Sequence, residues 1–126
     1  MSISFPLVSP TASGTDAADV VYIANPFAET IYVEALYVVP GVSVAQHAAN
    51  YITITVKDGS DTIAALSTVT VTGQALTAGT PAAMTISGSG LVLEIPALSS
   101  ITVDVAKAGT GPAYEFAVAA RCRKAR

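Results

Sequence analysis

Short segments in which apolar and polar residues alternate recur along the chain. Apolar side chains occupy every second position in residues 52–56 and 101–105, and residues 91–95 and 68–72 show a similar alternation. A period of two is typical of a strand that buries one face. Threonine takes many of the other positions, and β-branched polar residues suit the solvated face of a sheet. The pattern therefore predicts strands with one buried and one solvated face.

Three further segments raise the expected number of strands to about eight. Residues 20–24 are apolar over the length of a strand, and residues 114–120 are apolar except for Glu115. Residues 31–39 are almost continuously apolar. That run is typical of a central strand covered on both faces, or of one whose outer face meets a partner. Turn-forming residues separate the segments, and Asp58-Gly59 is the strongest hairpin signal among them.

No segment shows a sustained period of 3.6 residues, and only residues 42–49 suit a short helical turn. We therefore predict an all-β fold, an antiparallel, jelly-roll-like β-sandwich of about eight strands. The sandwich is expected at residues 20–120, between an N-terminal arm at 1–19 and a basic tail at 121–126. The chain has 126 residues, 52% of them apolar, which suffices for one core and one domain.

The expected arm is rich in proline, glycine, serine and threonine, and its apolar residues alternate at Ile3, Phe5 and Leu7. One interpretation is a frayed N-terminus. The other is an extended arm that adds a strand to a neighbouring subunit. In the second case Ile3, Phe5 and Leu7 belong to a partner interface.

Charge is divided unevenly between the body of the chain and its C-terminal end. The net charge is −3, but four of the six basic residues are Arg121, Arg123, Lys124 and Arg126, so the tail carries +4 and the rest −7. Nucleic-acid binding is not expected, because four phosphate contacts give little affinity beside an acidic body. The tail is either a solvated terminus or a cluster that docks onto an acidic partner. We assign its four cations to the predicted partner interface.

Few residues suit catalysis. His47 is the only histidine and Cys122 the only cysteine, so a catalytic triad or a zinc site lacks candidate groups. Asp58 and Asp61 fit a hairpin better than a calcium loop, which needs a closing glutamate. The chain lacks a phosphate-binding glycine loop and tryptophan. We therefore expect no enzyme activity, no cofactor, no metal and no small-molecule substrate.

Cys122 has two interpretations. It is either an ordinary reduced thiol of a chain made in the cytoplasm, or a reactive thiol whose pKa is lowered by Arg121 and Arg123. Residues 1–10 lack the basic and apolar regions of an export signal. The uncharged stretch 62–93 is too rich in threonine, serine and glycine for a membrane-spanning helix. No membrane association is expected.

Several motifs together resemble one family. A strand ends in YVVP at residues 37–40, a loop follows through His47, and the strand NYIT at residues 50–53 leads to the Asp58-Gly59 turn. A late strand is followed by KAGTG at residues 107–111. Over residues 18–112 this order resembles the small head-decoration, or cement, proteins of tailed bacteriophages.

The resemblance implies a non-enzymatic virion protein on the capsid exterior. Its partners would be the major capsid protein and further copies of itself, often as a trimer, and its effect would be to stabilise the capsid. No catalytic residue is carried over. A tail, baseplate or head-fibre component is an alternative, and so is a carbohydrate-binding β-sandwich module.

Overall fold

The computed structural model describes residues 4–14, 18–59, 61–86, 93–109 and 112–124. Strands account for most of these residues, and none of them is helical. The strands are β1 (Ser4–Val8), β2 (Ala12–Gly14), β3 (Ala18–Ala24), β4 (Ile31–Pro40), β5 (Ile52–Asp58), β6 (Asp61–Ser67), β7 (Ala82–Ile86), β8 (Leu93–Ile95), β9 (Ser100–Lys107) and β10 (Tyr114–Lys124). Neighbouring strands pair antiparallel. The predicted all-β antiparallel fold is confirmed.

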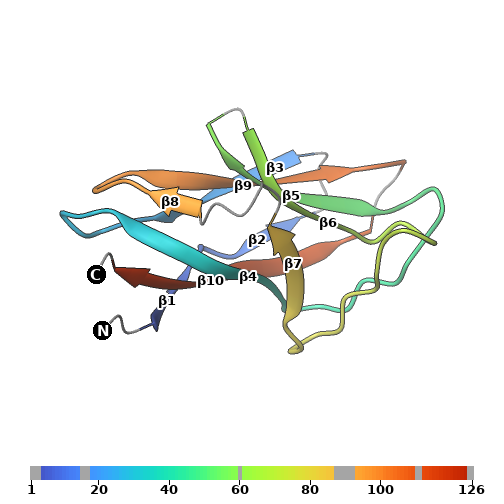
Figure 1. The fold of residues 1–126 in the computed structure, drawn as a ribbon. Helices are drawn as coiled ribbons and strands as arrows, with labels where there is room; N and C mark the ends of the chain where they lie inside the picture. The colour runs from blue at the N-terminus through green and yellow to red at the C-terminus, as the bar shows by residue number, and fades with distance from the viewer. Residues whose placement is uncertain (1–3, 15–17, 60, 87–92, 110–111, 125–126) are drawn as a thin grey trace.

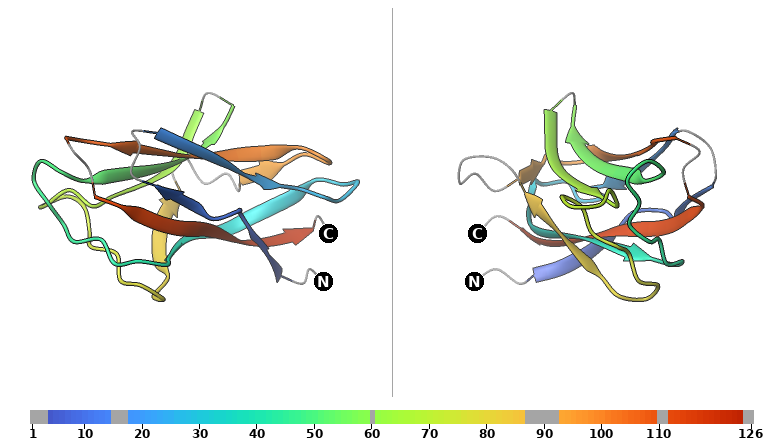
Figure 2. Two further views of the ribbon diagram at one scale, coloured as in Figure 1. Left: turned by 180° about the vertical axis from the view of Figure 1, so that it is seen from behind. Right: turned by 90° about the vertical axis from the view of Figure 1, so that its right-hand side faces the viewer.

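The strands form two layers (Figures 1 and 2). The β10 layer has the order β1-β10-β4-β7, with β2 paired to β10 and β8 paired to β4. The β9 layer has the order β6-β5-β9-β3. β7 pairs with both β4 and β6, so it joins the two layers along one side. On the other side β3 contacts β1 and β2, and the whole resembles a flattened, nearly closed barrel.

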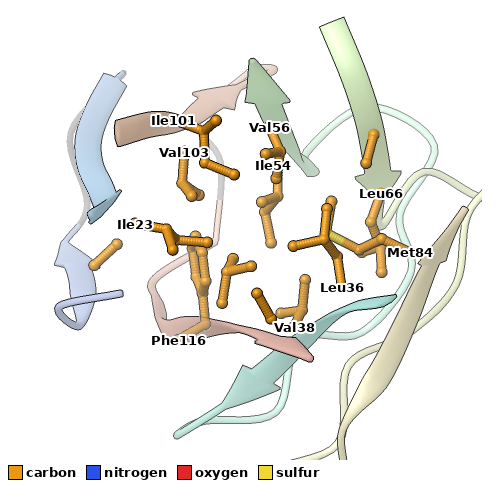
Figure 3. Close-up of a cluster of buried hydrophobic side chains, with 14 of the residues drawn as sticks. Ile23, Leu36, Val38, Ile54, Val56, Leu66, Met84, Ile101, Val103 and Phe116 are labelled. Atoms are coloured by element: carbon orange, nitrogen blue, oxygen red, sulfur yellow. The ribbon is translucent and has the colours of Figure 1, made fainter. Parts of the chain in front are cut away.

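The core lies between the two layers. Figure 3 shows Phe116 and Val38 from the β10 layer pointing toward Ile54 and Val103 from the β9 layer. Each of these four side chains is at most 1% exposed. Burying a large apolar side chain contributes about 1.5–3 kcal/mol, so the alternation that predicted the strands also supplies the core. Leu66 and Met84 close one end of this core (Figure 3).

The predicted hairpin at Asp58-Gly59 is confirmed. β5 and β6 pair on either side of it, and Gly59 has a φ of +64°. Left-handed backbone favours glycine because it has no Cβ. The threonine positions of β5 and β9 lie on the outer face of the β9 layer, as the alternation predicted.

Two other local predictions are wrong. Residues 68–72 were expected to form a strand, but Val71 has a φ of +77° and is 96% exposed at the tip of a turn. The helical turn expected at 42–49 is absent from that described segment, where Val44 and His47 instead form isolated bridges. Neither segment pairs with a neighbouring strand over more than an isolated bridge, so neither becomes a strand, whatever its own sequence pattern. Of the strand expected at 91–95, β8 covers the part from Leu93, and residues 91 and 92 lie outside the described residues.

The expected arm and tail are not separate from the sheet. β1 and β2 both pair with β10 of the same chain, so the described part of residues 1–19 supplies strands to the β10 layer. β10 itself continues through Arg121 to Lys124, so the described part of the tail is the end of a strand. The described part of the arm therefore adds strands within its own chain, whereas the sequence left open a frayed terminus or a strand added to a neighbouring subunit. β1 lies near the C-terminal end of β10 in Figure 1.

Candidate interaction surface

β10 is the strand on which the candidate surface is built. Its inward positions are all buried, and they are Tyr114, Phe116, Val118, Ala120 and Cys122. Its outward positions run from Glu115 through two alanines to Arg121 and Arg123. The basic end therefore belongs to a strand whose other face is anchored in the core. Its cations project from a fixed backbone.

A β-bulge in β4 sets the position of Glu34. Arg121 lies opposite Ala35 while Cys122 lies opposite Val33, so Glu34 is an extra residue in β4. The bulge keeps both Val33 and Leu36 on the buried face although they are three positions apart. Bulges commonly re-aim a side chain. Here the extra residue presents its carboxylate to the basic end of β10.

Glu34 lies between two arginines. Its Oε1 is 3.8 Å from Arg121 Nε, and its Oε2 is 3.5 Å from Arg123 Nε. The Arg123 guanidinium also lies over the Tyr32 ring, 5.1 Å from its centroid. Arginine on an aromatic face adds a cation–π attraction to the ion pair. The two pairs hold the arginines against β4.

Lys124 is held by the loop between β3 and β4. Its Nζ lies 3.8 Å from a Glu29 carboxylate oxygen and 4.5 Å from the centroid of the Phe27 ring. Phe27 in turn packs edge-on against Phe5, with ring centroids 5.4 Å apart and an interplanar angle of 78°. Two glutamates therefore pair with three cations at the end of β10, and Glu94, opposite Tyr32 on β8, is a third acidic residue nearby.

Asn25 fixes the loop that carries Phe27 and Glu29. Its side chain is buried, and its Nδ2 donates to the carbonyls of Glu29, Ile95 and Pro96 at 2.8–3.1 Å. Its Oδ1 accepts a hydrogen bond from the Phe27 N–H at 2.9 Å. A buried amide with all these partners makes the loop rigid. The Lys124 contacts therefore rest on a well-supported loop.

The predicted apolar interface of the arm faces the protein's own core. Phe5 and Leu7 lie opposite Cys122 and Ala120, whose side chains point inward, and both pack against the buried cluster. Both residues therefore direct much of their side-chain surface to the protein's own core, and both stay partly exposed. Of the other predicted interface residues, Ile3 and Arg126 lie outside the described residues. Arg121, Arg123 and Lys124 lie at the end of β10, as described above.

The outward positions of the β10 layer form an apolar face that the sequence analysis did not assign. Opposed pairs across three strands are Val8 with Ala119, Ala119 with Tyr37, and Tyr37 with Ala83. We use "apolar face" for Val8, Tyr37, Val39, Ala83, Ala117 and Ala119. Val8 and Ala83 are exposed, Val8 by 60%, and the other four residues are half-buried. A signal for this face was present, because AVAA at 117–120 has no polar residue at its alternate positions.

A shallow groove includes two residues of this face, Tyr37 and Ala119. It has a volume of about 290 Å³ and is lined by Phe5, Pro6, Tyr37, Ala119, Ala120 and Arg121. Apart from Arg121 the lining is apolar or aromatic. The groove therefore suits an apolar side chain of a partner.

Cys122 is buried beneath the basic end. Burial raises the pKa of its thiol from 9.0 to about 11, and the negative charge of Glu34 adds to the rise. The interpretation of Cys122 as a reactive thiol with a lowered pKa is therefore wrong. Desolvation of the inward side chain outweighs the two adjacent arginines, which point to the other face of β10.

The remaining candidate groups have structural contacts. His47 is exposed in a loop, and its Nδ1 accepts hydrogen bonds from the N–H groups of Ala49 and Asn50 at 3.0 and 2.9 Å. Within the described residues no three histidine, cysteine or acidic side chains cluster as metal ligands do. A polar groove of about 340 Å³ lies beside β6 and β7, lined by Ser67, Thr72, Gln74 and Thr85 among others. None of its lining residues is aromatic or charged.

No family model, no curated protein and no solved structure matches this chain. In the described part of the chain, no helix has the length and apolar character needed to span a bilayer. The geometry of the β10 layer is therefore the main ground for a functional assignment.

Proposed function

We propose that this chain is a non-enzymatic structural protein of a virion, which binds the outside of a phage capsid and stabilises it as a decoration protein. The observation that carries the proposal is the apolar face of the β10 layer, whose side chains are exposed or half-buried in the described chain. Contiguous exposed apolar patches commonly mark contacts with other macromolecules. The resemblance of residues 18–112 to head-decoration proteins supports a capsid as the setting.

The rigidity of the fold supports the same proposal. Both layers are anchored by one core, and the loop at Asn25 is tied by four hydrogen bonds. A protein that binds only the assembled shell stabilises it by mass action, and many copies multiply a modest contact. A rigid body loses little conformational entropy on binding, so weak contacts suffice.

The basic end is the proposed contact with the major capsid protein. Arg121 and Arg123 project from the outward side at one end of β10, Lys124 follows on the alternate side, and the three cations pair with Glu34 and Glu29. An acidic patch on the capsid surface would complement them, and charge complementarity mainly speeds association and fixes orientation. The rest of the chain is acidic and would be repelled by such a patch.

Binding to particles tests the proposal. Purified protein added to particles of the encoding virus that lack this chain should appear as density on the capsid exterior by electron microscopy. It should also raise the temperature at which the genome is released. An unchanged release temperature, or no density on the particle, would contradict the proposal. Density on the tail, baseplate or fibres would support the alternative location.

Two matched variants test the role of the basic end. Lys124→Glu reverses a charge that pairs with Glu29, and Lys57→Glu reverses one that pairs with Asp104 on the β9 layer. Only the first should weaken binding to particles, by about tenfold at low salt, because charge pairs at an interface rim act mainly on association. Equal loss in both variants would show a general charge effect and reject the basic end as the contact.

A further inference from the structure

We infer that the apolar face of the β10 layer is the contact between two copies of this chain, related by a two-fold axis. The inference rests on the proposed function in one respect, since both start from the apolar face: it names a second copy of this chain as the occupant of that face and leaves Arg123 and Lys124 for the capsid. Its tests use the purified protein alone, so they can fail while binding to particles succeeds. It rests on the order of side chains along β10 and β4, and on a charge pattern that complements itself.

The outward side chains of β10 are arranged symmetrically about the level of Val118. Ala117 and Ala119 flank that level, and Glu115 and Arg121 lie three residues away on either side. At about 3.3 Å per residue, each charge is about 10 Å from the centre. One end of the row is therefore acidic, the middle is small and apolar, and the other end is basic.

β4 repeats this symmetry beside β10. Val38 pairs with Val118, and the outward Tyr37 and Val39 lie on either side of that level. A two-fold axis across the strands at this level places Tyr37 of one copy over Val39 of the other. It also places Ala117 over Ala119. The contact on β4 joins a large and a medium side chain, and the contact on β10 joins two small ones. Both suit two sheets packed about 10 Å apart.

The same axis pairs the charges at both ends. Glu115 of one copy comes to the level of Arg121 in the second copy, and the reverse contact forms at the other end. Within the described residues Glu115 has no ion-pair partner, while Arg121 is held only at 3.8 Å by Glu34 and is 56% exposed. Both groups are therefore accessible to a second copy. A crossing angle of about 30° displaces them sideways by only about 5 Å, within reach of an arginine side chain.

A contact through the face fits better than a contact through the open edge of β1. The Ser9 N–H donates to the Val118 carbonyl, so by alternation the backbone nitrogens of Pro6 and Val8 point away from β10. Proline has no N–H to offer at that open edge. Edge prolines commonly prevent pairing with another chain. Addition of a foreign strand to β1 is therefore disfavoured, whereas the face remains available.

Sedimentation equilibrium of the purified full chain tests the inference first. The mass should rise from that of one chain to that of two across the micromolar range, and the dimer should weaken at high salt. A chain that stays monomeric throughout that range would overturn the inference. A trimer would overturn the two-fold geometry, because three copies cannot pair Glu115 and Arg121 in this reciprocal way.

Charge reversal provides the decisive comparison. Glu115→Arg and Arg121→Glu should each raise the dimer dissociation constant about a hundredfold, because each change places like charges together at both ends of the interface. The double variant with both reversals should restore most of the affinity, since the charges are again complementary between copies. Failure of the double variant to recover, with both single variants impaired, would reject this pairing.

Two matched alanine-to-arginine variants separate loss of the dimer from loss of the fold. Ala119→Arg places a long charged side chain at the centre of the apolar face, and Ala106→Arg makes the same change on the exposed outer face of the β9 layer. The first should abolish the dimer and the second should leave it intact, with both variants melting cooperatively. Dimers that tolerate Ala119→Arg would overturn the inference.

Discussion

The two layers present similar inner faces and very different outer faces. On the β9 layer the outward positions of the two central strands carry Thr53, Thr55, Lys57, Thr102 and Asp104, and the exposed Tyr22 lies beside them on β3. On the β10 layer the positions at the middle of the sheet carry alanine, valine and tyrosine. A solvated face gains from threonine and charge, and an apolar face loses by exposure. The difference is therefore the basis for the proposal that the outer face of the β10 layer meets a neighbour.

The largest expected effect on stability is the difference between two pairs of threonine substitutions in β4, one on its outer face and one on its inner face. Tyr37→Thr with Val39→Thr changes the outer face, and Leu36→Thr with Val38→Thr changes the inner face. The inner pair should lower the free energy of unfolding by about 5 kcal/mol, because it leaves cavities and buries two hydroxyls. The outer pair should cost less than about 1 kcal/mol, as is usual for surface changes. Urea denaturation measures both.

The outer pair also makes the β10 layer resemble the β9 layer. It should abolish dimer formation while leaving the monomer folded, and sedimentation would show this. If the outer pair destabilised the monomer as much as the inner pair, the outward orientation of Tyr37 and Val39 would be contradicted. If it left the dimer unchanged, the contrast between the two outer faces would have lost its functional meaning.

The contrast also explains which parts of the fold the sequence predicted. In β5 and β9 apolar and polar residues alternate strictly, so strand type, buried face and hairpin could all be predicted. In β4 the run from Val33 to Leu36 breaks that alternation at Glu34, and the break is the sequence signal of the bulge. In residues 68–72 alternation was present, yet the chain turns at Val71 because no neighbouring strand continues there.

The candidate surface was less predictable. Glu34 and Arg123 are distant in the sequence, and no local pattern indicates their pairing. The alternation at Phe5 and Leu7 was recognised, but an alternating segment does not say whether its partner strand is in the same chain. The tail was treated as a terminus because charge dominates it, although Cys122 in its middle continues the inward series of β10. All three cases depend on which distant strands pair, and the local periodicity of a sequence does not give that information.

One buried hydroxyl group in each layer accepts a hydrogen bond from a strand N–H, so the contributions of the two bonds to stability can be compared. The Ser9 Oγ accepts a hydrogen bond from the Val118 N–H at 2.9 Å, and the Thr68 Oγ1 accepts one from the Ile52 N–H at 3.1 Å. Ser9→Ala and Thr68→Val should each lower the free energy of unfolding by about 2 kcal/mol, because a buried N–H loses its acceptor. Amide exchange at Val118 and Ile52 should also accelerate. A loss at only one site would show that the two layers are unequally supported.

The pH dependence of stability tests whether Cys122 belongs to the core. Its pKa is about 11 in the folded chain and 9.0 in the unfolded chain, so the folded chain holds the proton more strongly between these values. Stability should therefore fall as the pH rises above 9, by about 1 kcal/mol between pH 8 and pH 10. Cys122→Ala should lack this part of the decline. A thiol that reacts with a disulfide reagent in the native protein at neutral pH would contradict the burial.

The smallest expected effect distinguishes the ion pairs of the two outer faces. Lys57 and Asp104 lie 3.3 Å apart on the solvated face, about one third exposed, and screening should limit their coupling to about 0.3 kcal/mol. Arg123 and Glu34 should couple by about 1 kcal/mol, because Arg123 also lies on Tyr32 and is the more buried cation. Double-mutant cycles to alanine measure both values at low and high salt. Because Arg121 also pairs with Glu34, replacing Arg121 should slightly strengthen the coupling between Arg123 and Glu34. If Arg123 and Glu34 couple no more strongly than Lys57 and Asp104, the basic end has no special role.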